Sequence, residues 1–317
     1  MLRFGCTKVV IDRLDPLVNP GQIPSPHVHQ IVGGNSFNAT MTTGDVSKES
    51  TCTTCQFSDD HSNYWTANMY FKAKNGTYKR VPQMGNPLQF SDQFSTQTNG
   101  GILGFRMLSG DPMDRERPRN MEKQNCFRCY TGPNFGGDVG APCQDASVDT
   151  PAFPAKACAG GIRSNILFPT CWDGKNLDSV DHKSHVAYPV DGPATFLSLG
   201  GACPSTHPVR IPQLMYEVTW DTTSFNNQAD WPTDGSSPFV LSTGDGTGFG
   251  QHADYVFGWK DDSLQKAMDT SGCFGASCAG LARQSIDQAK ACQVKTLVNE
   301  DVDGWLTELP GIGMEMK

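Results

Sequence analysis

The chain has 317 residues, enough for one large domain or two modest ones. Its formal net charge of −8 argues against a nucleic-acid partner, because neutralising phosphates requires a basic surface. No apolar run approaches the roughly 20 residues that a membrane span needs, so we also expect no membrane partner.

The first part of the chain reads as short strands separated by turns. One strand is predicted at residues 9–11 and another at residues 27–32, where His27, His29 and Ile31 would share one face because side chains alternate along a strand. Residues 64–71 predict a strand that returns at 78–81 through a hairpin turn at Asn75-Gly76. Further strands are predicted at 104–108, 165–168, 214–220, 239–242 and 251–259.

The C-terminal part changes character. A short helix can begin at Ser263, and apolar residues at helical spacing predict a helix over 278–292 that packs on the sheet. Long alternating helices, as a parallel α/β fold requires, are not indicated. We therefore expect a single all-β domain over 1–317, a disulfide-stapled β-sandwich or jelly roll with a core at about 5–260 and a helical C-terminal extension at about 261–317.

Twelve cysteines in a turn-rich chain favour an oxidised, secreted protein with about six disulfide bonds. The two Cys-x-x-Cys pairs, at residues 52–55 and 126–129, are expected to staple distant segments rather than to bind zinc. Residues 132–159 should form a long excursion held by cysteines. Glycosylation sequons at Asn38 and Asn75 fit a eukaryotic secretory route, and the start of the chain lacks an apolar leader, as in a mature form.

The segment 168–189 is unusually rich in polar groups that can bind ligands or catalyse reactions. It contains one cysteine, one tryptophan, three aspartates and two histidines: Cys171, Trp172, Asp173, Asp178, Asp181, His182 and His185. Such density is unusual for a segment that only fills a core. We interpret it as one wall of a functional site.

Three kinds of site remain open. His-x-His on a strand aims two imidazoles the same way, and a third ligand from another strand would complete a copper or zinc centre at His27 and His29. Alternatively, Asp181 with His185, or His252 with Asp254, could move protons in glycosidic bond cleavage. In the third alternative, the same groups tie loops together by buried hydrogen bonds without any chemistry.

Several motifs together resemble a known secreted family. They are Asp15-Pro16, His27-Val28-His29, Gly104-Phe105-Arg106-Met107, Phe168-Pro169-x-Cys171-Trp172-Asp173-Gly174, Asp181-His182-x-Ser184-His185, Cys203-Pro204, His207-Pro208-Val209 and His252-Ala253-Asp254. The set resembles the family called domain of unknown function 1996, common in fungi and also found in actinobacteria, over residues from about 9 to about 280. The resemblance implies secretion, disulfides and a cell-wall or biomass setting. Some fungal members carry a glucan-associated WSC module, which is not indicated here.

From these observations we expect a secreted carbohydrate-active protein, a glycoside hydrolase acting on a cell-wall polysaccharide such as a glucan and working as a monomer. The expected catalytic residues are Asp181, His182, His185, His252 and Asp254. The expected substrate-binding residues are Trp172, Asp173, Asp178 and His207. No cofactor is required in this mechanism. The alternatives are a histidine-rich protein that binds copper or zinc through His27 and His29, and a non-catalytic wall protein that binds glycan.

Overall fold

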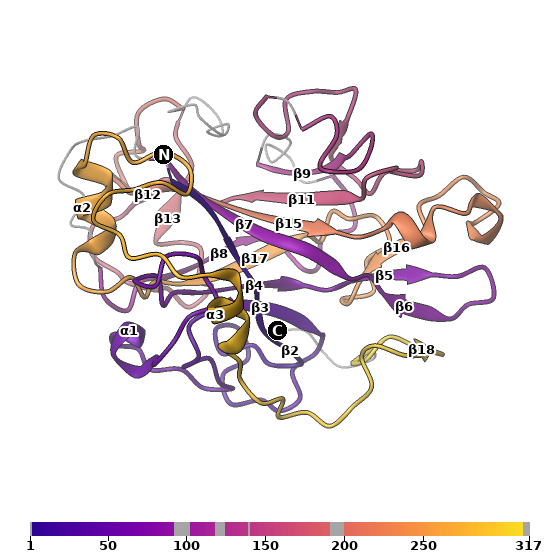
Figure 1. Cartoon of the computed structure of the whole chain (residues 1–317), viewed down its shortest axis with the longest axis horizontal. Helices are drawn as coiled ribbons and strands as arrows, with labels where there is room; N and C mark the ends of the chain where they lie inside the picture. The colour runs from indigo at the N-terminus through magenta and orange to yellow at the C-terminus, as the bar shows by residue number, and fades with distance from the viewer. Residues whose placement is uncertain (1, 92–101, 118–123, 139, 191–199, 313–317) are drawn as a thin grey trace.

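The computed structural model describes residues 2–91, 102–117, 124–138, 140–190 and 200–312. Antiparallel β-strands dominate it and the helices are short. Two large sheets carry most of the strands, the six-stranded one in the upper half and the five-stranded one in the lower half of Figure 1.

Both large sheets are antiparallel throughout. The six-stranded sheet has the order β1 (Leu2–Cys6), β7 (Gln83–Ser91), β15 (Gln213–Trp220), β11 (Ile162–Leu167), β9 (Asn125–Cys129) and β10 (Asp149–Thr150). The five-stranded sheet has the order β2 (Lys8–Asp12), β3 (His29–Gly33), β4 (Asn63–Ala67), β17 (His252–Val256) and β8 (Arg106–Gly110).

The main core contains side chains from both large sheets. Tyr216 of the six-stranded sheet and Tyr64 and Tyr255 of the five-stranded sheet are buried members of one apolar cluster. Tyr64 stacks on Tyr255 and contacts Tyr216, with ring centroids 5.0 and 6.2 Å apart. Because side chains alternate along a strand, this packing is that of a sandwich, which confirms the expected all-β class.

The other face of the five-stranded sheet is buried as well. Ile31, Trp65, Leu108 and Val256 lie on this outer face, where they pack with Leu14 and other loop residues in a second apolar cluster. The helix α1 (Val46–Glu49) contributes to this cover. Polar side chains on the outer face are consequently removed from water, and any ionisable group there is strongly perturbed.

Two smaller sheets complete the strands. One has the order β16 (Phe239–Leu241), β5 (Met69–Lys72), β6 (Tyr78–Arg80) and β18 (Trp305–Leu306), and the other β13 (Val186–Ala187), β12 (Cys171–Trp172) and β14 (Val209–Arg210). Two 3-10 turns, η1 (Thr223–Phe225) and η2 (Gln228–Asp230), follow β15.

The single strand predicted at 64–71 is wrong in one respect. The chain breaks at Asn68, so β4 belongs to the five-stranded sheet and β5 to the four-stranded one. The hairpin prediction is confirmed: β5 pairs with β6, and Gly76 turns the chain with a φ of 87°.

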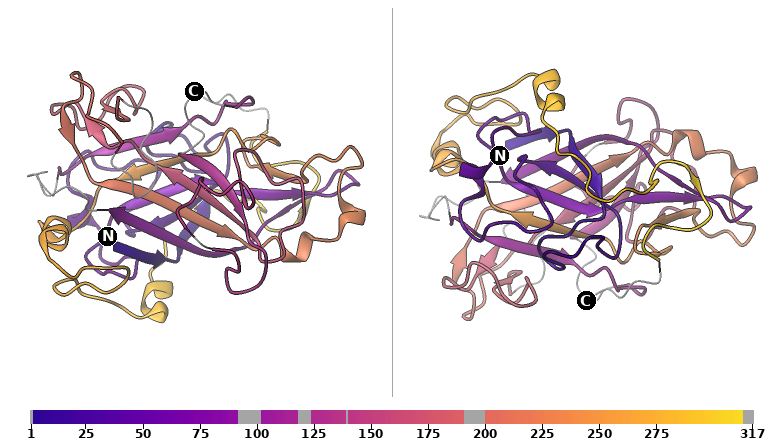
Figure 2. Two further views of the ribbon diagram at one scale, coloured as in Figure 1. Left: turned by 90° about the horizontal axis from the view of Figure 1, so that it is seen from above. Right: turned by 90° about the horizontal axis from the view of Figure 1, so that it is seen from below.

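The C-terminal extension is less helical than expected. The helix α2 (Ser263–Asp269) begins where predicted, but the helix predicted over 278–292 is wrong, because only α3 (Ile286–Ala291) forms. Gly280 has a φ of 98°, and Arg283 forms a β-bridge with Phe57; both geometries interrupt a helix. After α3 the chain runs along the outside of the strands to β18, as Figure 2 shows.

All twelve cysteines are paired, so neither Cys-x-x-Cys pair binds zinc. The bonds are Cys6–Cys55, Cys52–Cys292, Cys126–Cys143, Cys129–Cys158, Cys171–Cys203 and Cys273–Cys278. Two of them hold the predicted excursion against β9. Because disulfides persist in oxidising environments, six of them are consistent with an extracellular protein.

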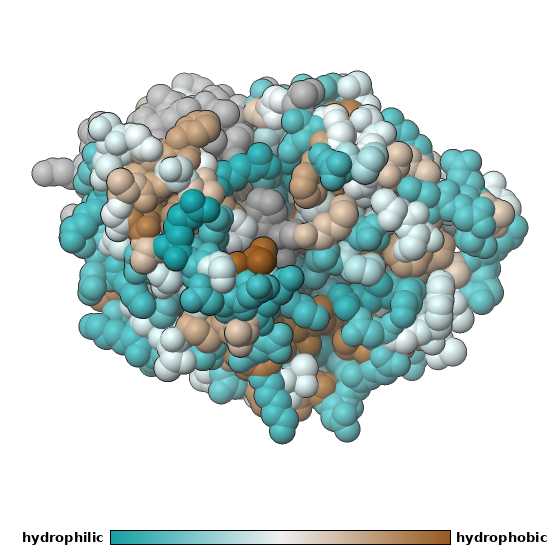
Figure 3. Space-filling view, in the orientation of Figure 1, coloured by the Kyte–Doolittle hydropathy of each residue, from teal (hydrophilic) through white to brown (hydrophobic). Residues whose placement is uncertain are grey.

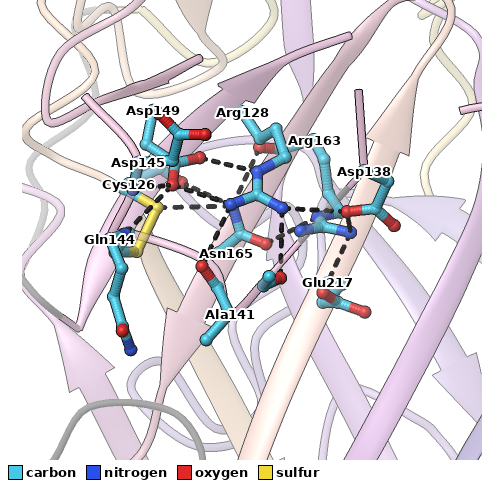
Figure 4. Close-up of polar contacts among 12 residues, drawn as sticks. Cys126, Arg128, Asp138, Ala141, Gln144, Asp145, Asp149, Arg163, Asn165 and Glu217 are labelled. Carbon is cyan, nitrogen blue, oxygen red and sulfur yellow. Dashed lines mark hydrogen bonds and ion pairs between the residues drawn. A yellow bond between two sulfur atoms is a disulfide. The ribbon is translucent and has the colours of Figure 1, made fainter. Parts of the chain in front are cut away.

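Ion pairs also fix the excursion, on the outer face of the six-stranded sheet (Figure 4). The buried guanidinium of Arg128 contacts Asp149 at 2.8 Å and Asp138 at 3.0 Å. Arg163 contacts Asp138 at 2.8 Å and the buried Glu217 at 3.3 Å. Each buried charge has a partner of opposite sign, as stability requires. We therefore interpret this network as structural.

Candidate metal centre

Three histidines from two distant parts of the chain meet on the outer face of the five-stranded sheet. His29 begins β3, His27 lies two residues before it, and His252 begins β17. His29 is directly opposite Ala67 of β4, the strand that lies between β3 and β17. Residues directly opposite each other in an antiparallel pair have side chains on the same face, so the small buried side chain of Ala67 lies on the face of His29. The predicted convergence of His27 and His29 is confirmed, with ring centroids 4.1 Å apart.

The ligand atoms of the three rings are close enough to bind one ion. One nitrogen from each histidine lies within 4.8 Å of the other two. The Nε2 atoms of His27 and His252 are 3.3 Å apart. Zinc–nitrogen bonds of 2.0–2.1 Å at a tetrahedral angle place two ligand nitrogens about 3.3 Å apart. That pair therefore already has the spacing of two ligands, and a nitrogen of His29 lies within 4.8 Å of both.

Backbone carbonyls fix two of the rings in the form that a metal requires. Nδ1 of His29 is 2.9 Å from the carbonyl oxygen of Leu14, and Nδ1 of His252 is 2.9 Å from that of Gly250. A carbonyl only accepts, so each Nδ1 must carry the proton and donate it. Each Nε2 then presents a lone pair. Such outer hydrogen bonds regularly orient histidine ligands.

The environment keeps the imidazoles neutral. Burial lowers the pKa of His29 to about 3, although the hydrogen bond to Leu14 opposes it. Burial, with a smaller contribution from His29, lowers the pKa of His252 to about 4. The pKa of His27 falls well below its usual value, first because of burial and then because His29 and His252 are close. A neutral imidazole is the form that binds a metal, so no proton has to leave near pH 7.

Two buried carboxyl groups lie beside the histidines. Asp15 accepts hydrogen bonds from the backbone N–H groups of Leu17 and Val18, and burial raises its pKa. Asp254 is fully buried on the same face of β17 as His252, and neither of its oxygens has a hydrogen-bond partner within the part of the chain that the structure describes. Burial, and next the nearby Asp15, raise its pKa well above the usual value. A bound cation would favour the ionised form of these carboxyl groups, whose negative charge would then offset its own.

One cavity borders the histidines, and a second cavity shares Leu108 of β8 with it. The smaller, of about 20 Å³, is lined by Asp15, Val18, Asn19, Pro26, His27, Leu108, Pro112 and His252. The larger, of about 250 Å³, is lined by Leu108, Ser109, Gly110, Asp114, Asn125, Pro169, Lys183, Val186, Ala187, Tyr188 and Phe249. The histidine cluster thus borders the smaller, polar cavity, and the larger cavity adjoins the smaller one at Leu108.

The segment 168–189 lies along the other edge of β8. The backbone N–H of Leu108 donates to His182 and that of Arg106 donates to Leu177, so the segment extends the sheet beyond β8. Through β8 it is a neighbour of β17, and Lys183 acts electrostatically on both His252 and Asp254.

The polar groups of this segment mostly hold its own turns. Asp181 Oδ1 accepts from the backbone of Lys183 and Ser184, and these bonds, against some burial, lower the pKa of Asp181. The ring of His182 is hydrogen-bonded to Asp178. The ring of His185 is hydrogen-bonded to Ser179 through one nitrogen and to the Arg106 carbonyl through the other.

The remaining predicted residues also have local partners. Asp173 accepts from Lys175 and Asn176, and Trp172 donates its indole N–H to the Asn176 carbonyl while its ring contacts Phe105 edge-on. His207 bonds through Nε2 to the Ser184 carbonyl.

The segments that contain the predicted histidines are therefore neighbours, but their imidazoles do not form one site; the segments are those of His27 and His29, of 168–189, of His207 and of His252. His27, His29 and His252 converge, with Asp254 beside them, whereas His182, His185 and His207 are engaged elsewhere. The segment 168–189, which we expected to form one wall of a functional site, lies near the converging histidines but adds no imidazole to them. The catalytic and substrate-binding roles themselves stay predictions.

Sequence reasoning missed several residues beside the centre. Asp15 was recognisable only as part of an Asp-Pro turn, and Asn19 and Ala67 carried no signal. Lys183 stands between two histidines in the sequence, and that position was the available clue.

The described helices are short, and one face of the surface is seen in space-filling view. Within the part of the chain that the structure describes, none of the helices has the length and hydrophobicity required to cross a bilayer. The face shown in Figure 3 is mostly hydrophilic, with apolar side chains in small separate groups. Broad apolar patches, which mark membrane or protein contacts, are not seen on this face.

Comparison with known proteins identifies the family. A search of curated proteins and a search of solved structures each returned no match. The family model described as domain of unknown function (DUF1996) matches residues 15–259, a range that contains all three converging histidines. The chain belongs to the DUF1996 family.

Proposed function

We propose that this chain is a secreted metal-binding protein that holds one zinc or copper ion through His27, His29 and His252. The observation that carries the proposal is the approach of three buried ligand nitrogens to within 4.8 Å of one another. Imidazole suits both metals, and three imidazoles are a recurrent zinc ligand set.

A purely structural cluster accounts less well for the hydrogen bonding. His29 Nε2 and His27 Nδ1 have no partner among the described residues, although both are buried. A buried polar atom without a partner costs about 1–3 kcal/mol. A metal ion would bind the Nε2 lone pair of His29 and remove that cost, which a structural role for the ring leaves in place.

The setting also supports the proposal. Six disulfides favour an oxidising compartment, and there a reduced thiol site for zinc would not persist. Imidazoles do not oxidise in this way, so a histidine centre remains available outside the cell.

Metal analysis by mass spectrometry tests the proposal, on protein purified without a histidine tag. We expect about one zinc or copper per chain, retained on dialysis or regained after chelation, and its loss in His27→Ala, His29→Ala and His252→Ala. His182→Ala and His207→Ala, at histidines outside the cluster, should retain the metal. A wild-type protein that neither contains nor rebinds a stoichiometric metal would sink the proposal, as would equal loss in the two controls.

A second candidate function is binding of a cell-wall polysaccharide, and the larger cavity favours it. Its volume of about 250 Å³ can hold a sugar unit. Tyr188 and Phe249 offer aromatic surface, while Asp114 and Lys183 offer polar contacts. Asn125 Oδ1 is buried without a partner among the described residues, so it can accept from a sugar hydroxyl.

Glycan titration with product chromatography tests this candidate and separates binding from cleavage. Asn125→Ala should weaken any binding to a glucan oligosaccharide, whereas Asn75→Ala, at an exposed hairpin, should not. Binding that is unchanged in Asn125→Ala would place the glycan elsewhere. The predicted acid/base roles of Asp181 and His185 are tested in the same assay, because cleavage that survives both alanine substitutions would contradict them.

A further inference from the structure

Three ligands leave a metal incompletely coordinated, and the chain supplies no obvious fourth. Among the described residues, the group of metal-ligating side chains around His27, His29 and His252 contains no further histidine, cysteine or carboxylate. Structural zinc sites are usually closed by four protein ligands, whereas catalytic sites have three and keep one position open. The question is therefore what the structure places at the fourth position.

The small cavity borders two of the three ligands. His27 and His252 line it, but His29, which is fully buried, does not. The cavity is thus bordered by two of the three rings and not by the third. Its volume of about 20 Å³ is enough for a single water molecule, which needs roughly 10–15 Å³.

The walls of the cavity are built for a polar occupant. Asn19 lines it and is only 4% exposed, and its side-chain N–H₂ group has no hydrogen-bond partner within the described residues. Asp15 lines it as well and supplies carboxylate oxygens. A water molecule donates up to two hydrogen bonds and accepts up to two, so it can accept one from the amide of Asn19 and donate one to the carboxylate of Asp15.

We propose that the metal centre keeps a fourth coordination position open towards this cavity, where it binds a water molecule or another small ligand held by Asn19 and Asp15. This inference rests on the proposed metal-binding function and assigns the site to the open class. The ligand is exchangeable, because Val18 at the rim of the cavity is partly exposed. A small anion such as azide can then displace the water, with no change in the oxidation state of the metal.

Cobalt substitution makes the fourth position visible, since Co²⁺ absorbs in the visible range and Zn²⁺ does not. The Co²⁺-loaded protein is titrated with azide, and we expect a saturable spectral change at one azide per metal. Val18→Phe should fill the rim and weaken azide binding by about tenfold or more, while Co²⁺ affinity changes by less than about threefold. Val18→Ala, the matched control, should leave azide binding at least as strong as in the wild type.

The outcomes separate this inference from the function on which it rests. Failure of Co²⁺ to bind stoichiometrically would contradict the metal-binding proposal itself. Stoichiometric Co²⁺ whose spectrum ignores azide would overturn the open position and indicate a fourth protein ligand. If Val18→Phe does not fold, Asn19→Ala replaces it: weakened azide binding with Co²⁺ affinity retained supports the inference, and unchanged azide binding contradicts the role of Asn19.

Discussion

Removing one histidine should abolish the stabilisation that a metal gives to the fold. A ligand that binds only the folded state at a hundred times its Kd stabilises it by about 2.7 kcal/mol. If His29→Ala weakens metal binding by about a hundredfold, the same metal concentration contributes only about 0.4 kcal/mol. At about 2 °C per kcal/mol for a chain of this size, the metal-induced rise in Tm should fall from about 5 °C to about 1 °C.

The comparison needs a control that loses a similar buried ring. His29 is fully buried and His185 is 1% exposed, and each ring makes a hydrogen bond to a backbone carbonyl. Both alanine variants should therefore lower the Tm of the metal-free protein, since each leaves a cavity and an unpaired carbonyl.

Differential scanning calorimetry with and without zinc or copper measures the metal-induced rise in each protein. We expect the full rise in the wild type and in His185→Ala, and almost none in His29→Ala. An equal rise in His29→Ala and the wild type would refute the assignment of His29 as a ligand. Loss of the rise in His185→Ala would show that the metal lies in the segment 168–189 instead.

Three further predictions concern the surrounding fold. Burial raises the pKa of Asp60 to about 7, so the folded carboxyl keeps a proton that the unfolded chain has already lost. The free energy of unfolding should therefore fall by up to about 4 kcal/mol as the pH rises from 4 through 7. Asp60→Asn should remove this pH dependence in urea titrations, and an unchanged pH dependence would contradict the prediction. Ala67→Leu should reduce metal content without unfolding the chain, because the larger side chain enters the space opposite His29. Normal metal content in this variant would contradict the placement of Ala67 beside the histidines. Arg128→Met should destabilise the protein by about 3–5 kcal/mol, because the carboxylate of Asp149 stays buried without its partner; a change below about 1 kcal/mol would contradict a structural network.

The sequence identified the class of fold because its signals were local. Short alternating runs and frequent turn residues predicted antiparallel strands, and the hairpin at Asn75-Gly76 formed where expected. The predicted helix at 278–292 failed because spacing alone cannot reveal that Arg283 forms a β-bridge with Phe57, far away in the sequence. Tertiary pairing decided the conformation there, against local periodicity.

Two of the three histidines of the candidate metal centre could be predicted to converge, and the third could not. The alternation of a strand places His27 and His29 together, which the sequence shows directly. His252 joins them only because β4 lies between β3 and β17 in the sheet. The order of strands in a sheet cannot be read from a local sequence pattern. No spacing rule connects residues 225 positions apart.

The segment 168–189 shows the opposite limitation. Its density of aspartate and histidine predicted a ligand or catalytic surface, but the same side chains can hold turns. Asp181 and Asp173 each accept from two backbone N–H groups of their own loop. Composition cannot distinguish these roles, because both require short polar side chains near turns.

X-ray absorption spectroscopy of the metal-bound protein tests the central claim most directly. The account predicts one zinc or copper per chain with three imidazole nitrogens at about 2.0–2.1 Å for zinc and one further light atom. The number of imidazoles should fall to two in His252→Ala. A metal coordinated mainly by carboxylates, or an imidazole count unchanged in His252→Ala, would contradict the three-histidine centre.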